Sequence, residues 1–142
     1  TRGQCMVMLM RAFGIEPEEN PTDNFADAGS TYYTKYLAAA KHLGISGGVG
    51  KNMFAPNKDI TRQEMFTFLY SILKIIGELP EATGDKSLSS YSDSDAIAVE
   101  SKEAMDLLVR AGIVNGNGGK LRASDASTRA QMAQVLYNIL TK

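Results

Sequence analysis

The chain has 142 residues, of which 44% are hydrophobic, and 15 basic and 16 acidic side chains leave a formal net charge of −1. This length and apolar content fit one domain with a buried core. The balanced charge argues against a nucleic-acid partner, because a phosphate-backbone binder needs a basic face. With one cysteine and one histidine, a disulfide framework and a cysteine zinc site are excluded. We expect no metal and no cofactor.

Membrane insertion is not expected either. The most apolar stretch, 65–76, is interrupted by Thr67, Ser71 and Lys74, and a membrane span needs about 20 mainly apolar residues. The chain opens at Thr1 in what looks like the middle of a structural unit, so we expect the first repeat to be incomplete. The absence of a signal peptide then says nothing about location.

Five helices are predicted in chain order, over 1–13, 33–43, 61–76, from about Val99 to Gly112, and over 128–140. The second carries apolar residues at i, i+3/i+4 and i+7 spacing. A glycine follows both the second and the fourth, where a left-handed residue can end a helix. No convincing run alternates as a strand does, so the predicted fold class is all-α.

A Thr-Arg-x-Glu/Gln motif opens three of these helices. It reads Thr1-Arg2-Gly3-Gln4, Thr61-Arg62-Gln63-Glu64 and Thr128-Arg129-Ala130-Gln131. In such a capping box the threonine hydroxyl accepts from the backbone N–H three residues on, and the Glu or Gln reaches back to the threonine N–H. Each cap stabilises its helix by about 1 kcal/mol.

Other landmarks recur in step with this motif. An aromatic-x-Asp triplet and a Gly-Ile pair precede it in both later copies, as Phe25-Ala26-Asp27 with Gly44-Ile45 and as Tyr91-Ser92-Asp93 with Gly112-Ile113. The spacing predicts a single domain over 1–142 with three sub-repeats. These are 1–20 (the end of repeat 1), 21–77 (repeat 2) and 91–142 (repeat 3), with a polar inserted loop over 78–90.

This ordered set resembles the S-layer homology domain family over almost the whole chain. The second repeat carries the fullest pattern, with Tyr32, Gly47, Phe54-Ala55-Pro56 and Ile60 before its Thr-Arg motif. The third has Gly116 but departs from the family at Leu121, Ala123 and Ser127, which makes its site the weaker candidate. The resemblance implies a pseudo-threefold helical domain of the three-prong spindle type. It also implies an extracellular place on the bacterial cell wall, where such domains bind a secondary cell-wall polysaccharide that often carries a pyruvate ketal.

The motif also suggests how an acidic sugar could bind. The head of a helix presents unpaired N–H groups and a partial positive charge, and an arginine adds a planar fork for a carboxylate. Tyrosine could stack on a sugar face, and acidic or amide side chains could meet its hydroxyl groups. The candidate ligand-binding residues are Arg62, Arg129, Arg2, Thr61, Thr128, Glu64, Gln131, Asp27, Asp93 and Tyr32.

A purely structural interpretation stays open for most of these residues. The threonines and Glu64 or Gln131 are explained by capping alone, and the two aspartates could each cap the helix that follows. Arg62 could pair with Asp27 or Asp59 and brace a turn. Capping does not require arginine, however, so the binding hypothesis depends chiefly on Arg62 and Arg129.

Three functional hypotheses follow. The leading one is a non-catalytic envelope-anchoring module that binds wall polysaccharide. The alternative is a structural or protein-interaction module of a surface protein that has lost sugar binding. A third is a hydrolase in the parent protein, because the resemblance implies a module that is often fused to enzymes. No nucleophile–base pair for it stands out in these residues. A methionine face at Met6, Met8 and Met10, if left bare by the incomplete first repeat, would favour self-association.

Overall fold

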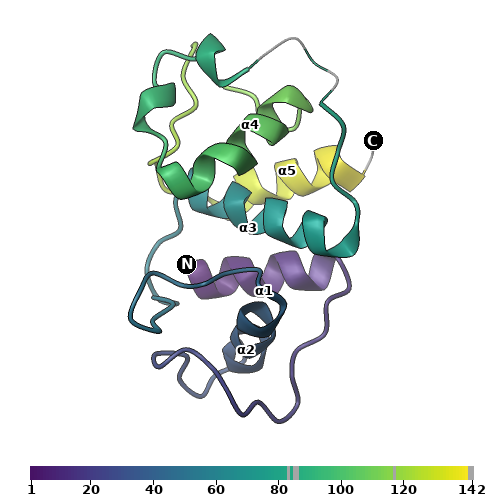
Figure 1. The fold of residues 1–142 in the computed structure, drawn as a ribbon, viewed down its shortest axis with the longest axis vertical. Helices are drawn as coiled ribbons and strands as arrows, with labels where there is room; N and C mark the ends of the chain where they lie inside the picture. The colour runs from purple at the N-terminus through teal and green to yellow at the C-terminus, as the bar shows by residue number, and fades with distance from the viewer. Residues whose placement is uncertain (83, 85–86, 117, 141–142) are drawn as a thin grey trace. The chain divides into compact units, whose positions relative to one another are not determined.

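The computed structural model describes residues 1–82, 84, 87–116 and 118–140. Residues 83, 85 and 86 of the predicted loop 78–90 lie outside the described residues. So do residues 117, 141 and 142 of the predicted third repeat. The described chain contains α- and 3-10 helices and only isolated β-bridges (Figure 1). The all-α class is confirmed, whereas the threefold spindle arrangement stays a prediction.

The five predicted helices are all present, with bounds within a few residues of those expected. They are α1 (Arg2–Ala12), α2 (Thr34–Leu43), α3 (Arg62–Ile76), α4 (Lys102–Arg110) and α5 (Arg129–Leu140). Three short 3-10 helices were not predicted, namely η1 (Leu88–Ser90), η2 (Ser94–Ala96) and η3 (Val99–Ser101). The fourth helix thus begins with a 3-10 turn, closed by a hydrogen bond from Ser101 N–H to the Ala98 carbonyl at 2.9 Å.

The capping boxes are confirmed at all three motifs. The threonine hydroxyl accepts from the backbone N–H of the third helical residue at 3.2 Å in α1, 3.3 Å in α3 and 3.1 Å in α5. In return, the side chain of Glu64 accepts from Thr61 N–H at 3.0 Å, and that of Gln131 from Thr128 N–H at 2.9 Å. Thr and Glu/Gln therefore cap these helices without the help of a ligand.

The two predicted glycine stops are confirmed as well. Gly44 and Gly112 have φ of 77° and 76°, a left-handed conformation that costs glycine little. The next residue turns inward in both copies, since Ile45 and Ile113 are buried and donate their N–H groups to Ala40 and Leu108. Each pair therefore ends a helix and anchors the following loop to the core.

The chain divides into two compact units. One comprises Thr1–Ile60 and Ser71–Glu78, and within it α1 packs against α2 around fully buried Met6, Leu37 and Phe54. The other comprises Thr61–Tyr70 and Leu79–Lys142, and within it α4 contacts η1 and η3. Its fully buried side chains include Phe66, Met105 and Leu108. The sub-repeat boundaries stay a prediction.

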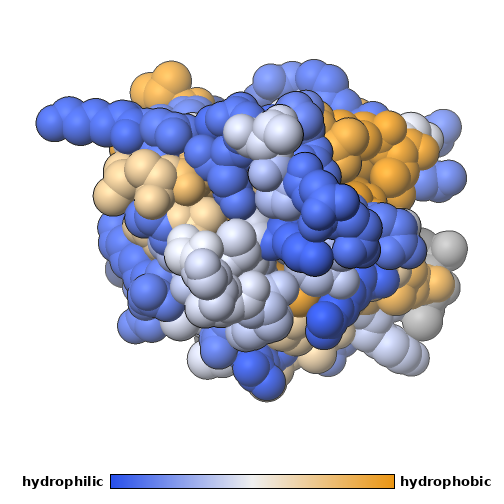
Figure 2. Space-filling view, turned by 90° about the horizontal axis from the view of Figure 1, so that it is seen from below, coloured by the Kyte–Doolittle hydropathy of each residue, from blue (hydrophilic) through white to orange (hydrophobic). Residues whose placement is uncertain are grey.

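In the face shown in Figure 2, hydrophilic residues prevail and apolar ones gather in separate patches. Among the described residues, no helix combines the length and the apolar character that crossing a membrane would take. Of the three methionines expected on one face of α1, Met6 and Met10 have no accessible surface and Met8 is partly exposed. Self-association through this face stays a prediction.

Candidate binding site

Asp27 and Asp93 have the same structural role in the two repeats. The two carboxylate oxygens of Asp27 accept hydrogen bonds from the backbone N–H groups of Phe54 and Ala55, both at 2.8 Å. Asp93 accepts in the same way from Leu121 at 2.8 Å and from the next residue at 2.9 Å. No side-chain cap bond forms at the helices that follow, so the capping alternative for these aspartates is wrong.

The aspartate bonds leave the following loop in a fixed shape. Ala55 and Arg122, the residues bonded by the second carboxylate oxygen, have φ of 58° and 54°, a conformation that is uncommon for residues with a side chain. The N–H groups of this turn therefore face the carboxylate. Its carbonyl groups are left for other partners.

Those partners are the heads of the motif helices. In one unit, Arg2 N–H donates to the Lys58 carbonyl and Gly3 N–H to the Pro56 carbonyl, both at 2.9 Å. Arg2 also donates from Nε to the Phe54 carbonyl at 2.9 Å. Three carbonyls at alternate positions of one loop thus accept hydrogen bonds from the first residues of α1.

The other unit repeats this arrangement. Arg62 N–H and Gln63 N–H donate to the carbonyls of Asp125 and Ala123, both at 2.9 Å, and Arg62 Nε donates to the Leu121 carbonyl at 3.1 Å. At α1 and α3 the first helical N–H groups are therefore occupied by protein. The predicted anion site built from unpaired amides is wrong at these two helices.

Arg2 is held by a hydrogen bond from its Nε and by an aromatic ring against its guanidinium. The residue is only 3% exposed, and its Cζ lies 4.8 Å from the centroid of the Phe54 ring, within the range of a cation–π contact. Buried cations that are bonded in this way brace a fold and are costly to expose or remove.

Arg62 is different because part of it faces a pocket. The side chain is half-buried and its Cζ lies 5.4 Å from the centroid of the Phe66 ring. Its two terminal nitrogens make no hydrogen bond within the described part of the chain. Burial lowers the pKa of Arg62, and the charge of Asp125 acts in the opposite direction. Arginine nonetheless stays charged at neutral pH.

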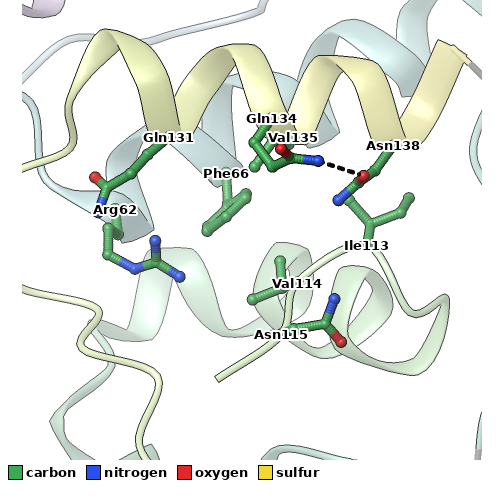
Figure 3. Close-up of a pocket in the computed structure, with 9 residues that line it drawn as sticks. All are labelled: Arg62, Phe66, Ile113, Val114, Asn115, Gln131, Gln134, Val135 and Asn138. Carbon is green, nitrogen blue, oxygen red and sulfur yellow. Dashed lines mark hydrogen bonds between the residues drawn. The ribbon is translucent and has the colours of Figure 1, made fainter. Parts of the chain in front are cut away.

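The pocket has a volume of about 200 Å³ and lies between α3, the loop after α4, and α5 (Figure 3). Amide side chains line the same pocket as the Arg62 guanidinium, with Gln131 drawn nearest to it in Figure 3 and Gln134 and Asn138 at the other end, and Phe66 supplies an aromatic ring. Gln134 donates to Asn138 at 3.0 Å. The lining residues are Arg62, Phe66, Ile113, Val114, Asn115, Gln131, Gln134, Val135 and Asn138.

This lining combines one fixed cation with neutral donors and acceptors. A guanidinium can take a carboxylate through two parallel bonds, and amide groups both donate and accept, as sugar hydroxyls do. Sequence reasoning named Arg62 and Gln131 but missed Asn115, Gln134 and Asn138. The signal for two of them was present, since positions 131, 134 and 138 follow the i, i+3, i+7 spacing of one helix face.

The other predicted site residues lie elsewhere. Arg129 and Thr128 are exposed at the head of α5. Tyr32 belongs to the first unit, is 56% exposed and meets Tyr33 edge to face at 5.5 Å. No described group of His, Cys, Asp or Glu side chains could hold a metal ion.

The repeated helix–loop unit defines a helical-repeat protein, and the amide-lined pocket is its candidate binding site. The chain belongs to the S-layer homology domain family, whose model matches residues 24–66 and 90–133. This membership points to the bacterial cell surface or cell wall.

Curated relatives align over nearly the full chain. An exoglucanase, XynX, of Acetivibrio thermocellus is 29% identical over 100% of this chain and 13% of its own length. An endoglucanase of Bacillus sp. (strain KSM-635) is 32% identical over 100% of this chain and 15% of its own length. The S-layer protein EA1 of Bacillus anthracis is 28% identical over 95% of this chain and 15% of its own length. The chain therefore corresponds to a small part of each relative.

Proposed function

We propose that this chain is a non-catalytic module that anchors a protein to the bacterial cell envelope by binding an acidic, pyruvate-bearing secondary cell-wall polysaccharide. The main observation in support of this proposal is the half-buried guanidinium of Arg62, which presents its two terminal nitrogens to a pocket lined by amide side chains. Membership of the family supports the anchoring role. Some relatives have the names of enzymes, but this chain covers only a small part of them. It covers 8–15% of the lengths of XynX, an amylopullulanase of Thermoanaerobacterium thermosulfurigenes and the endoglucanase.

The pocket chemistry favours a terminal acidic group over a neutral chain. A charge-assisted bond from arginine to a carboxylate contributes about 1.5–3 kcal/mol, more than a neutral hydrogen bond. The volume of about 200 Å³ is smaller than the roughly 300–1,000 Å³ of pockets that enclose drug-sized ligands. A pyruvate ketal with the adjoining edge of one sugar fits this size and charge better than a stretch of polysaccharide.

Arg62 is well placed for this role because its position is fixed before a ligand arrives. The bond from Nε to the Leu121 carbonyl and the contact with Phe66 hold the side chain. Less side-chain freedom is then lost on binding, which raises affinity. Gln131 keeps its Oε1 on the Thr128 cap, so its amide nitrogen is the part that a sugar would contact.

The test is a calorimetric titration of the chain with matched wall saccharides that carry or lack the pyruvate ketal. We expect at least about tenfold weaker binding without the ketal, equivalent to about 1.4 kcal/mol. A Gln134→Ala/Asn138→Ala variant should weaken both titrations, because it removes neutral contacts. Arg110→Ala is the matched control, since this exposed arginine lies outside the pocket and pairs with Asp106. Equal affinity for both saccharides would contradict the proposal.

A further inference from the structure

The loop that accepts hydrogen bonds from the head of α3 carries two opposite charges, Arg122 and Asp125. A turn joins these residues, since Asp125 N–H donates to the Arg122 carbonyl at 3.1 Å. Their side chains form an ion pair with 3.9 Å between Arg122 Nη1 and Asp125 Oδ2, and both side chains are more than half exposed. An exposed pair at this distance is weak. The negative charge of Asp125 is therefore incompletely neutralised.

Asp125 is also a direct neighbour of Arg62. Its carbonyl accepts from Arg62 N–H at 2.9 Å, and Arg62 Nε donates to the Leu121 carbonyl in the same loop at 3.1 Å. Within the described part of the chain, no ion pair joins the Asp125 carboxylate to Arg62. Burial lowers the pKa of Arg62, and the charge of Asp125 partly opposes this effect. Asp125 thus acts on the guanidinium through its field and leaves the terminal nitrogens to the pocket (Figure 3).

The equivalent loop of the second repeat has neither of these charges. Lys58 takes the place of Asp125, because its carbonyl accepts from Arg2 N–H in the same way. Ala55 takes the place of Arg122, with φ of 58° against 54°. The shape of the loop therefore does not require the two charges. They occur beside the arginine that faces a pocket, and are absent beside the buried one.

A ligand anion on Arg62 would lie in the field of Asp125. The repulsion between them grows in proportion to the ligand's charge. A carboxylate carries one negative charge, whereas a phosphate monoester carries about 1.5 to 2 at neutral pH. Asp125 must therefore lower the affinity of the pocket for a phosphate more than its affinity for a carboxylate.

We propose that Asp125 is a specificity-determining residue of this pocket, which makes it favour a single carboxylate over a phosphate monoester. Arg122 is a positioning residue that keeps the Asp125 carboxylate on its own side of the turn and so limits the repulsion of the carboxylate. The inference rests on the proposed function, because it concerns the same pocket and the same arginine.

The test is a calorimetric titration of the whole chain with one saccharide in three forms, carrying the pyruvate ketal, a phosphate monoester or neither. In Asp125→Asn, we expect about threefold tighter binding of the ketal form, the effect of one exposed charge. The phosphate form should gain about five- to ninefold, because the same repulsion acts on a larger charge. The neutral form should bind as it does to the wild type, which a merely structural change would not allow.

Two further conditions separate charge from shape. Asp125→Glu keeps the charge and should keep the wild-type preference for the ketal form. In about 1 M salt the gain of Asp125→Asn should largely disappear, because the Debye length falls to about 3 Å. Asp106→Asn is the matched control, since Asp106 forms the exposed pair with Arg110 outside the pocket lining. It should change none of the three affinities.

Arg122→Ala tests the positioning role. We expect about threefold weaker binding of the ketal form when Asp125 is present, and less than about a twofold change in the Asp125→Asn background. The same loss in both backgrounds would show that Arg122 acts on the ligand itself, which contradicts this role.

The results for the wild type keep the two proposals apart. If it binds the ketal and neutral forms equally, the proposed function fails, and this inference with it. If the wild type prefers the ketal form but Asp125→Asn changes the ketal and phosphate affinities by the same factor, or leaves both unchanged, only the inference about Asp125 is wrong.

Discussion

The Nε–H of Arg62 donates to the carbonyl oxygen of Leu121 across 3.1 Å, and this bond separates the guanidinium into a fixed part and a presented part. The terminal nitrogens are left for the pocket. Arg2 makes the corresponding bond to Phe54 but is only 3% exposed. The same motif position is therefore a buried brace at Arg2, whereas at Arg62 it braces the loop and also presents the two nitrogens that we propose bind the ligand.

Arg62→Lys should separate these two parts. A lysine ammonium can approach the Leu121 carbonyl or a ligand carboxylate, but it cannot hold both with a planar fork. We expect a loss of at least about tenfold in affinity for a pyruvylated saccharide and a decrease of about 1 kcal/mol in the free energy of unfolding. Calorimetry and urea denaturation measure the two effects. Unchanged affinity in the folded variant would remove Arg62 from the binding site.

Gly48→Ala should destabilise the loop of the second repeat. Gly48 has φ of 82°, and an added Cβ would lie 2.3 Å from the Met53 carbonyl oxygen and 2.8 Å from the Phe25 ring. Because backbone and a buried ring must both move, we expect a loss of about 3 kcal/mol in the free energy of unfolding.

Gly47→Ala is the control for this prediction. A Cβ at Gly47 meets nothing within 4 Å, so the variant should stay within about 0.5 kcal/mol of the wild type. Gly116→Ala should resemble Gly48→Ala, because its Cβ would lie 2.3 Å from the Tyr91 ring and 2.6 Å from the Lys120 carbonyl oxygen. Equal denaturation midpoints for the Gly47 and Gly48 variants would contradict the packing described.

Asp93 should make stability depend on acid pH. The N–H group of Leu121 donates to its carboxylate and lowers the pKa of Asp93, relative to about 3.9 in an unfolded chain. Because the folded pKa is the lower one, the stabilising contribution is complete above the unfolded value. It is lost as the pH falls through the folded value.

Urea denaturation of Asp93→Asn at neutral and acid pH checks this sign. An amide keeps one acceptor and turns a donor toward an N–H group, so we expect a loss of about 1–2 kcal/mol at pH 7 that shrinks as the pH falls. Asp95→Asn is the control, because Asp95 is exposed and should show neither effect. A difference between wild type and Asp93→Asn that grows in acid would show that the sign is wrong.

Local structure was the most predictable part of the molecule. Capping boxes at Thr61 and Thr128, and the glycine stops at Gly44 and Gly112, depend on interactions within four or five residues, which the sequence displays directly. The alignment of landmarks was less accurate. Gly47 was matched to Gly116, but the crowded glycine of the second repeat is Gly48, because it faces the aromatic ring of its repeat as Gly116 does.

The binding site was less predictable because it depends on contacts between distant segments. Nothing local indicates that Asp93 holds the loop at Leu121, or that this loop takes up the N–H groups at the head of α3. Because those contacts occupy the backbone N–H groups at the head of α3, these groups cannot bind an anion. Only the Arg62 side chain is left there as a candidate for that role. Repetition in sequence also did not reveal that Arg2 is buried while Arg129 is exposed, since burial depends on whether a loop packs against the head of each helix.

Arg2→Met tests the structural role of the first arginine. Methionine keeps much of the apolar volume but removes the bond from Nε to the Phe54 carbonyl and the charge over the Phe54 ring. We expect the free energy of unfolding to fall by about 2 kcal/mol, whereas Arg129→Met, at an exposed position, should change it by less than about 0.5 kcal/mol. Titration of folded Arg2→Met with a pyruvylated saccharide should match the wild type, because Arg2 does not line the pocket. A variant that folds as stably as the wild type but loses the saccharide would instead make Arg2 a ligand-binding residue, as its place in the motif first suggested.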